Sequence, residues 1–594
     1  MLVACLKAKK KDVARSKSDR SVEDSSAPMG MGCTREFERV SAATGMLSEV
    51  STQFEPCLDV PNGGVLWAIP ALLENGLLRY AQIDFSLPDG YYGCKHIFLL
   101  LATMALARVK NIEQLRYHPA GEWGKLTGLD RIPEVKTLRE KISILAQPEQ
   151  VSRWSNRLSQ DWMEAAPQSA GVLYVDGHVR TYHGKQTKLP RRYVSRQRLC
   201  LRGTTDYWVN DQLGRPFFVL NMPVDPGLLQ VLKEKVVPRL IAEVPGQPSN
   251  EQLENDPFCH RFMVIFDREG YSPNFFKFLW KNRIACQTYH KYPAGDWPES
   301  QFSEQIVHLS QSETVAINLA ERGLLLSNGM WVREIRKLTT SGHQTSVLST
   351  DYISDAGVIA FHMFSRWSQE NFFCYMMEHF GLNKLVSYKI EPVDETTTVV
   401  NPDWRCIDGL VRKKAAVLGR KKNEIGALCI QDGQTKIECA EYDKQMGELK
   451  LEVALLQKET NELKASRKEI KKHIPFGQLS KEEQFYQLSP TRKHFIDMIK
   501  MIAYRAETAM AILLHDVISR PDDARSLLRE LFTTETDLIP DTDKGTLTVC
   551  LHHLTNRMSD KAIEFLADIL NKSETVYPGT NLQMIFKLVS KPNP

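Results

Sequence analysis

The run Gly171-Val172-Leu173-Tyr174-Val175-Asp176-Gly177-His178 decides the fold of this chain, because four consecutive apolar side chains end on a carboxylate. A strand that is apolar at every position is covered on both faces, so this one is predicted at the centre of a sheet. The stretch 262–267, Phe-Met-Val-Ile-Phe-Asp, repeats the design and ends on Asp267. Ligands of an open α/β sheet gather at the carboxyl ends of such strands, so Asp176 and Asp267 are expected to converge at one rim.

A third acid, Glu370, lies in a predicted helix over residues 358–380 that is apolar on nearly every side. The apolar residues of this helix are Ile359, Phe361, Met363, Phe364, Trp367, Phe372, Phe373, Met376, Met377 and Phe380. A helix of this kind is buried, and a buried carboxylate is costly unless a cation or a strong partner meets it. Arg366, one turn earlier, supplies part of that charge, whereas a metal ion shared with Asp176 and Asp267 accounts for all three acids.

Three carboxylates form the ligand set of a hard cation, so the sequence predicts bound Mg²⁺, with Mn²⁺ as the alternative metal. Two such ions about 4 Å apart clamp the attacking and leaving oxygens of a phosphodiester, which is the chemistry of nucleases and strand-transfer enzymes. Taken singly, each acid is explained equally well as an ordinary residue at a strand end or on a helix surface. The combination of Asp176, Asp267 and Glu370 favours a catalytic site.

A run of basic residues follows the first acid strand. Residues 177–202 contain no acidic side chain, and their basic residues are Arg180, Lys185, Lys188, Arg191, Arg192, Arg196, Arg198 and Arg202. A solvated surface is the simpler explanation of such a run. A one-signed run beside a group of carboxylates nevertheless favours contact with the polyphosphate backbone of nucleic acid.

The length of 594 residues corresponds to roughly three or four domains. Residues 1–58 are predicted to be a basic, disordered tail, with a DNA-binding arm as the alternative. Residues 64–150 are predicted to be a helical domain, for which a DNA-binding helix-turn-helix and plain packing against the core are equally good explanations. The residues that its last helix offers to DNA are Lys136, Thr137, Arg139 and Lys141.

The order of elements predicts a ribonuclease-H-like α/β core over residues 165–400, in which helices flank a mixed sheet. A β-rich insertion is expected over residues 290–357. Residues 403–473 have the 3-4 spacing of apolar residues that is typical of a coiled coil, and an internal helical hairpin is preferred to pairing with a second copy. Residues 486–594 are predicted to be a small C-terminal α/β region that serves dimerisation or DNA-end architecture.

The composition excludes several classes of protein. The longest apolar stretch, residues 97–107, is about half a membrane span, so no membrane partner is expected. The twelve cysteines are scattered without a CxxC pair, and no GxxxxGK phosphate loop is present. These features predict a cytoplasmic protein that associates with DNA and uses no nucleotide cofactor.

The three acidic motifs carry a resemblance to a known family. Asp176 in VDGH, Asp267 in FDREG and Glu370 in RWSQENFF resemble the DDE catalytic triad of bacterial insertion-sequence transposases. They are most similar to the cut-and-paste group, whose Glu lies in a Tyr-x2-Arg-x3-Glu-x6-Lys helix after a β-rich insertion. The resemblance implies metal binding by the three acids and phosphate contact by Arg366. Met363 and Met377 stand where that pattern has Tyr and Lys, which puts the grip on the DNA end and a hairpin intermediate in doubt.

Enzymes of this family bind terminal inverted repeats of double-stranded DNA as homodimers, hydrolyse a phosphodiester and attack target DNA with the freed 3′-hydroxyl. The resemblance implies the same partners and reaction for this chain. Trp297, in the insertion, is expected either to stack on an extruded base or simply to pack. Two other functions remain open, namely a ribonuclease-H-like nuclease without strand transfer and an inactive DNA-binding remnant.

Overall fold

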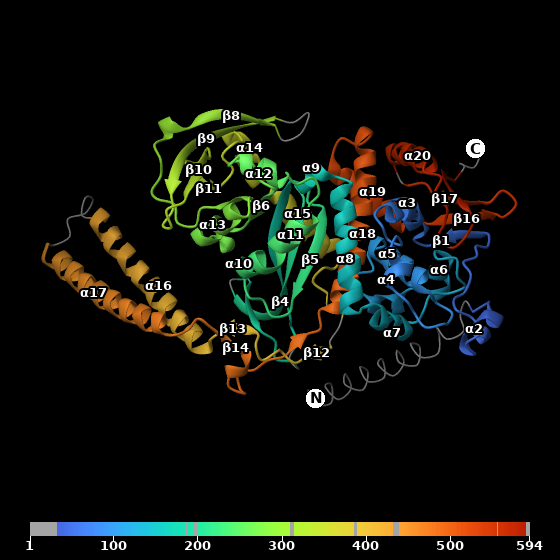
Figure 1. Cartoon of the computed structure of the whole chain (residues 1–594), viewed down its shortest axis with the longest axis horizontal. Helices are drawn as coiled ribbons and strands as arrows, with labels where there is room; N and C mark the ends of the chain where they lie inside the picture. The colour runs from blue at the N-terminus through green and yellow to red at the C-terminus, as the bar shows by residue number, and fades with distance from the viewer. Residues whose placement is uncertain are drawn as a thin grey trace, which may run out of the picture.

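The computed structural model describes residues 33–184, 187–194, 197, 199–308, 314–384, 386, 389–431, 439–554 and 556–589. The chain is a mixed α/β protein of elongated shape, with a long helical hairpin at one end and a small sheet at the other (Figure 1). Among the described residues, we find no helix long and apolar enough to cross a membrane.

The largest sheet in the described part of the chain has the strand order β3-β4-β2-β6-β7-β11-β10-β9-β8, and β5 pairs with β4. Its first half consists of β2 (Val172–Thr181), β3 (Arg191–Val194), β4 (Leu199–Asn210), β5 (Pro216–Met222), β6 (Met263–Phe266) and β7 (Ala285–Tyr289). Strands β2, β6 and β7 are parallel, whereas β4 runs antiparallel to β2 and to β5. The parallel centre explains the unbroken apolar runs, because Leu173, Tyr174 and Val175 and all four residues of β6 are buried.

The insertion continues the same sheet beyond β7. Its strands are β8 (Ser303–His308), β9 (Thr314–Leu325), β10 (Trp331–Leu338) and β11 (Gln344–Ser349), and β11 pairs with β7. Helix α14 (Ala356–Phe364) covers these strands and shares a separate hydrophobic cluster with them. The helices between β5 and β7 are α10 (Leu228–Val231), α11 (Val237–Glu243), α12 (Asn250–Asn255) and α13 (Pro273–Lys281).

Helix α18 (Thr491–Leu513) is the central helix of the molecule and is buried on nearly every side. It packs against β5 and against the N-terminal helices α3 (Ile69–Glu74), α5 (Cys94–Leu106) and α8 (Pro148–Glu164). The remaining N-terminal helices are α2 (Glu36–Ala43), α4 (Ala81–Asp84), α6 (Ala120–Lys125), α7 (Val135–Leu145) and α9 (Pro167–Ala170). One continuous hydrophobic core therefore joins the N-terminal helices, the first half of the large sheet and the C-terminal region.

The C-terminal sheet has the order β1-β16-β17-β18, with β1 (Cys57–Val60), β16 (Thr536–Asp541), β17 (Thr546–Leu551) and β18 (Gln583–Leu588). Helices α19 (Pro521–Thr533) and α20 (Arg557–Asn571) accompany it. The expectation of a disordered tail over residues 1–58 is wrong for residues 33–58, which contain α2 and the first half of β1. The Arg39 guanidinium pairs with Asp130, and Val50 is fully buried, so this segment is held by the core. Residues 1–32 lie outside the described residues.

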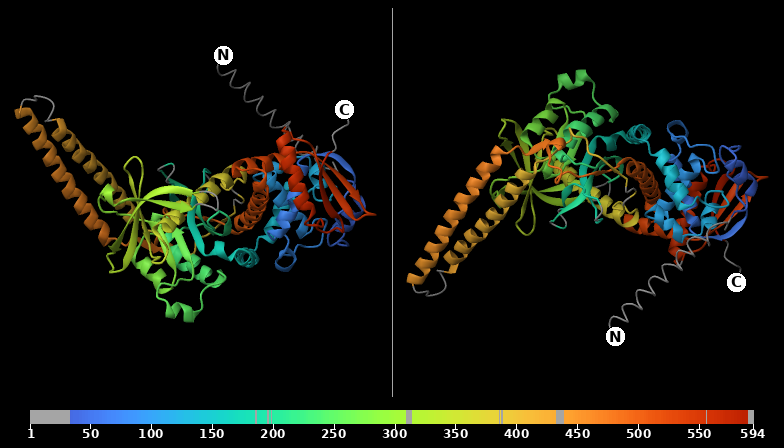
Figure 2. Two further views of the ribbon diagram at one scale, coloured as in Figure 1. Left: turned by 90° about the horizontal axis from the view of Figure 1, so that it is seen from above. Right: turned by 90° about the horizontal axis from the view of Figure 1, so that it is seen from below.

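The helical hairpin consists of α16 (Pro402–Gln431) and α17 (Cys439–Glu469), which lie side by side and project from the sheet (Figure 2). At its root β13 (Thr398–Val400) pairs with β14 (His473–Pro475), and nearby β12 (Ile390–Glu391) pairs with β15 (Gln487–Leu488). Lys414 and Glu459 form an ion pair between the helices. Thr460, which weakens the predicted apolar seam, is buried and donates its hydroxyl to the Leu456 carbonyl.

Candidate active site

The first two acids are neighbours because of the register of two parallel strands. The last pair of the β2/β6 ladder is Val175 with Phe266, so Asp176 and Asp267 follow it on adjacent strands. Strand β6 ends there, whereas β2 continues to Thr181 and pairs Asp176 with Trp208 of β4. The expectation that Asp176 stands at the end of its strand is therefore wrong, although both acids lie where the parallel pairing stops.

The third acid lies on a helix that differs from the predicted one. The helix expected over residues 358–380 is interrupted at Ser365 and Arg366, and Glu370 belongs to the first turn of α15 (Trp367–His379). The side chain of Glu370 is 51% exposed, so the expectation of a buried carboxylate is also wrong. The stretch 358–380 is apolar on nearly every side because α14 buries one face against the insertion, whereas α15 buries another face against the main core.

Arg366 joins the acids into one cluster, which we call the acid cluster and define as Asp176, Asp267, Glu370 and Arg366. Its Nη1 lies 3.2 Å from Asp267 Oδ1, and its Nη2 lies 3.3 Å from Glu370 Oε1. The guanidinium is 13% exposed, and Nη1 is buried without a hydrogen-bond partner in the described structure. It also lies 5.4 Å from the ring centre of Tyr289, at the end of β7. One donor of this buried cation is thus unsatisfied.

The charge balance of the acid cluster is visible in the pKa of Asp176. Burial of its carboxyl group raises this pKa to about 6, and the charges of Asp267 and Glu370 act in the same direction. The Arg366 charge and the hydrogen bond from the Gly177 backbone oppose the rise. Burial and the charge of Asp267 also raise the pKa of Glu269. The sequence analysis did not single out Glu269 or Tyr289, although Glu269 belongs to the FDREG motif.

The donor chemistry of the acid cluster fits a hard divalent cation, because three carboxylates share a single guanidinium. Asp176, Asp267 and Glu370 are the residues that would hold the ion. Among the described side chains, however, these three do not have ligand atoms that all lie within 4.8 Å of one another. The guanidinium stands between Asp267 and Glu370, so the cluster is more open than a loaded metal site.

A second group of ligating side chains lies at the C-terminal sheet. Asp59, Glu535 and His552 do have ligand atoms within 4.8 Å of one another, and His552 Nε2 lies 3.1 Å from Asp537 Oδ1. Both carboxylates of the trio are exposed. The sequence gives no sign of this group, because nearly 500 residues separate Asp59 from the others and only β1 brings it there.

The residues predicted to contact DNA fall into several environments. Arg180 is buried in an ion pair with Asp206, so it is not available to DNA. Lys188 donates to the Glu482 carbonyl, whereas Arg192 contacts the carbonyl and carboxylate of Asp225. The three other basic candidates Lys185, Arg196 and Arg198 lie outside the described residues. Arg191 is exposed on β3.

Two further groups of residues that were expected to contact DNA are Trp297 and the basic residues of α7. Trp297 is 7% exposed, and the guanidinium carbons of Arg322 and Arg336 lie 4.4 and 4.3 Å from its ring centre. This environment matches the packing alternative rather than stacking on a base. On α7, Arg139 pairs with Glu113, and burial lowers the pKa of Lys141. Those two cations of the suggested helix-turn-helix are thus engaged within the protein.

A groove beside this region was not anticipated from the sequence. It has a volume of about 690 Å³ and lies between strands β3 and β4 and the root of the helical hairpin. Its hairpin side includes Arg405, Lys413 and His473, which are more than 200 residues away from the basic run in sequence. That separation explains why the two walls could not be connected from the sequence.

Comparison with protein-family models identifies a family for this chain. A family model described as "Transposase protein" matches residues 30–590, which is nearly the whole chain. A search of curated proteins finds no match.

Proposed function

Because the chain belongs to this transposase family, we propose that it is a DDE-type DNA transposase that cuts and joins phosphodiester bonds with Asp176, Asp267 and Glu370. The observation that carries the proposal is the acid cluster. Three carboxylates from β2, the end of β6 and the start of α15 surround one guanidinium, although they are separated by 91 and 103 residues (267 − 176 and 370 − 267). Structural ion pairs are usually balanced, so this excess of negative charge favours a functional site.

The sheet supports a ribonuclease-H-like core, as the sequence predicts. In the order β5-β4-β2-β6-β7, an antiparallel half continues into a parallel half, and helices flank the sheet. The two aspartates lie at the junction of these halves. We take the strands β8 to β11 as the β-rich insertion of the insertion-sequence group, because they separate Asp267 from the helix that carries Glu370.

Each residue of the acid cluster has a chemical part in the proposed reaction. Mg²⁺ or Mn²⁺ held by the carboxylates would polarise the reacting phosphodiester and lower the pKa of a bound water. Arg366 holds Asp267 and Glu370 close together against their mutual repulsion. Its Nη1 is ion-paired with Asp267 but forms no hydrogen bond in the described structure, so it can donate to a phosphate oxygen. A charge-assisted hydrogen bond of this kind is about twice as strong as a neutral one.

The partners follow from the family and the chemistry. We propose that the chain binds double-stranded DNA at terminal inverted repeats, acts as a homodimer in the cytoplasm and transfers the cut end to target DNA. Arg191 and its exposed basic neighbours supply charge for the phosphate backbone. Arg180 and Trp297 do not belong to this DNA surface, because both are buried in contacts within the protein.

The decisive experiment uses purified chain, a labelled duplex with the terminal repeat and Mg²⁺. Wild type is compared with Asp267→Ala and with Asp296→Ala, a matched change at an exposed acid of the insertion. We expect wild type and Asp296→Ala to give cut and joined products and Asp267→Ala to give neither. Cutting without joining would favour the nuclease, and binding without cutting would favour the inactive remnant. Cutting and joining by Asp267→Ala at the wild-type rate would refute the proposed site.

A further inference from the structure

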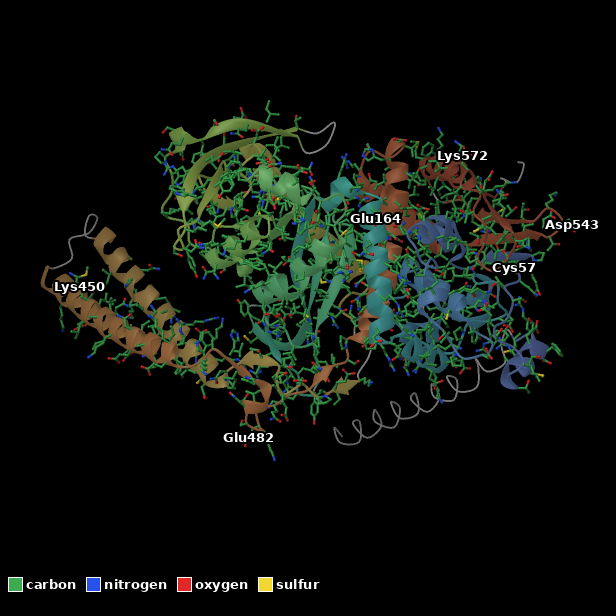
Figure 3. The ribbon with its side chains drawn as sticks, in the orientation of Figure 1. Cys57, Glu164, Lys450, Glu482, Asp543 and Lys572 are labelled. Atoms are coloured by element: carbon green, nitrogen blue, oxygen red, sulfur yellow. The ribbon has the colours of Figure 1, made fainter. Side chains whose placement is uncertain are left out.

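The groove at the root of the hairpin is concave and strongly basic. Six Lys or Arg side chains line it, against the two carboxylates of Asp225 and Glu483. The six are Lys188, Arg191, Arg192, Arg202, Arg405 and Lys413. They come from both walls, because the first four belong to the segment of β3 and β4 and the last two to α16. Figure 3 helps to locate it, because Glu482 near the root and Lys450 along α17 are both labelled.

The floor of the groove is apolar. Val399, Leu479 and Phe485 line it and belong to a small hydrophobic cluster that also contains Phe476. The rings of Phe476 and Phe485 lie 5.1 Å apart, edge to face, so the floor is a packed surface rather than a loose loop. An apolar floor under a basic rim suits a ligand that presents sugars or bases on one side and phosphates on the other.

Several cations of the groove are not used by the protein itself. Among the described residues, Arg405 and Lys413 have no ion-pair partner, and both are exposed. Arg192 is held by the Asp225 carbonyl and lies 3.5 Å from its carboxylate, yet its Nε is buried without a hydrogen bond. Burial and the nearby charge of Arg405 lower the pKa of Arg192. An anion in the groove would relieve this mutual repulsion.

Asp225 neutralises part of the positive charge of the groove, and contacts within the protein fix its carboxylate in place. Its carboxylate accepts hydrogen bonds from the Thr205 hydroxyl at 2.8 Å, the Tyr207 hydroxyl at 2.7 Å and the Gly227 backbone at 2.7 Å. These contacts fix the start of the turn after β5 to strand β4. The carboxylate is therefore a structural part of the wall.

The groove adjoins the acid cluster. Tyr207, which donates to Asp225, is paired in the β2/β4 ladder with Gly177, the residue directly after Asp176. Neighbouring residues of β2 and β4 thus connect the wall of the groove to the proposed reaction centre.

We propose that this groove, which we call the hairpin groove, holds the phosphodiester backbone of DNA next to the bond that reacts. This inference rests on the proposed function. It gives the helical hairpin a role as one wall of the DNA path, with Arg405 and Lys413 contacting phosphates from the side opposite Arg191. The apolar floor favours a single strand, for example the strand that becomes unpaired beside the cut.

The test measures binding of fluorescent DNA to the full chain by anisotropy over a range of salt concentrations. The variant is Arg405→Gln/Lys413→Gln, and the control is Arg520→Gln/Lys572→Gln, which removes the same charge from exposed positions next to α19 and α20 of the C-terminal region (Figure 3 labels Lys572). Each lost phosphate contact lowers the slope of log affinity against log salt by about 0.9 for duplex and about 0.7 for single-stranded DNA. We expect the variant to lose nearly two such contacts and the control to lose none.

Single-stranded, duplex and pre-nicked DNA are measured in parallel. A larger loss of affinity for single-stranded or pre-nicked DNA than for duplex DNA supports a single strand as the occupant. An equal loss of affinity for all three DNAs supports duplex DNA as the occupant of the groove. Wild-type salt slopes in the variant for all three DNAs would overturn the inference. The Asp267→Ala assay is independent of this result, so loss of the groove proposal would leave the proposed function standing.

Native cysteines provide a second measurement without any substitution. Cys200 and Cys406 line the groove and are exposed, whereas Cys374 is exposed one turn after Glu370. Alkylation of each cysteine by iodoacetamide is followed by peptide mass spectrometry, with Cys550 of the C-terminal sheet as the reference. We expect bound DNA to slow alkylation at Cys200 and Cys406. Slowing at Cys374 with unchanged rates at both groove cysteines would place DNA on the acid cluster alone and overturn the inference.

Discussion

Two groups of charged side chains include residues of the same strand and have opposite charge balance. Asp176 and Arg180 lie four residues apart on β2, on the side that alternation gives to both. Asp176 belongs to the acid cluster, in which three carboxylates share one guanidinium. Arg180 belongs to what we call the α18 network, in which Arg180 and Lys493 face Asp206 and Asp497, and Asn221 donates to both carboxylates.

The pKa values of the two aspartates follow this difference. Burial raises the pKa of Asp176 to about 6, and the charge of Arg366 opposes this rise only in part. Asp206 is buried as well, yet the charges of Arg180 and Lys493 lower its pKa below the usual range. A balanced network stabilises the fold, whereas a network with excess negative charge favours the binding of a further cation. This contrast separates a structural ion network from a candidate catalytic site on one strand.

The largest effect is expected at the unbalanced group. Asp176→Asn should lower the rate of Mg²⁺-dependent DNA cleavage by about 10⁴-fold, as loss of an essential catalytic group does. The midpoint of thermal unfolding should stay the same or rise, because the change removes repulsion from Asp267 and Glu370. Single-turnover cleavage and calorimetry measure the two quantities. Wild-type cleavage by this variant would remove Asp176 from the site.

The balanced group should respond in the opposite way. Asp206→Ala leaves Arg180 buried without its partner, which costs about 3–5 kcal/mol of unfolding free energy in urea. The double change Arg180→Met/Asp206→Leu removes both charges and should recover most of that loss. A small effect of Asp206→Ala on unfolding would show that the network does not stabilise the protein.

Arg366 should affect the reaction more than the fold. Arg366→Gln removes the donor nearest the proposed phosphate, so we expect cleavage to fall by about 10²-fold, the loss typical of one preorganised donor. Arg366→Lys keeps the charge but not the planar pair of donors, so its cleavage rate should lie between those of wild type and Arg366→Gln. Equal cleavage by wild type and Arg366→Gln would limit Arg366 to a structural part.

The smallest effect concerns Lys500, which lies on α18 and donates to the carbonyls of Lys110 and Gly381. Burial lowers its pKa to about 7, so the folded chain binds fewer protons than the unfolded chain between pH 7 and the ordinary lysine value. Stability should therefore rise with pH in this window, by at most about 1.4 kcal/mol per pH unit. Lys500→Met should lack this rise in urea unfolding at pH 7, 8 and 9. The same slope in both proteins would contradict the assignment.

Much of the large sheet could be predicted from sequence, because its signals are local. The apolar runs before Asp176 and Asp267 predict buried strands, and the structure has β2 and β6 there. The transposase family also agrees with the resemblance of the three motifs. The predictions that were wrong concern features that depend on packing between distant parts of the chain. The break at Ser365 was hidden because two helices that bury different faces together resemble one helix that is apolar all round.

The basic run shows a second limit of sequence patterns. Arg180 and Arg191 look alike in the sequence, but only the fold pairs Arg180 with Asp206 from β4 and leaves Arg191 exposed. The opposite wall of the groove comes from the hairpin, beyond any local window. Residues 33–58 looked disordered because their partners, such as Asp130 and β16, follow much later in the chain.

The pairing of β1 with β16 has a consequence for synthesis of the protein. The Asp59 backbone donates to the Asp537 carboxylate across 478 residues. Strand β1 therefore cannot pair with β16 until nearly the whole chain has been synthesised. A chain shortened to end before residue 536 would keep an exposed strand edge, and such edges promote aggregation. Folding of the N-terminal strand thus depends on the C-terminal sheet.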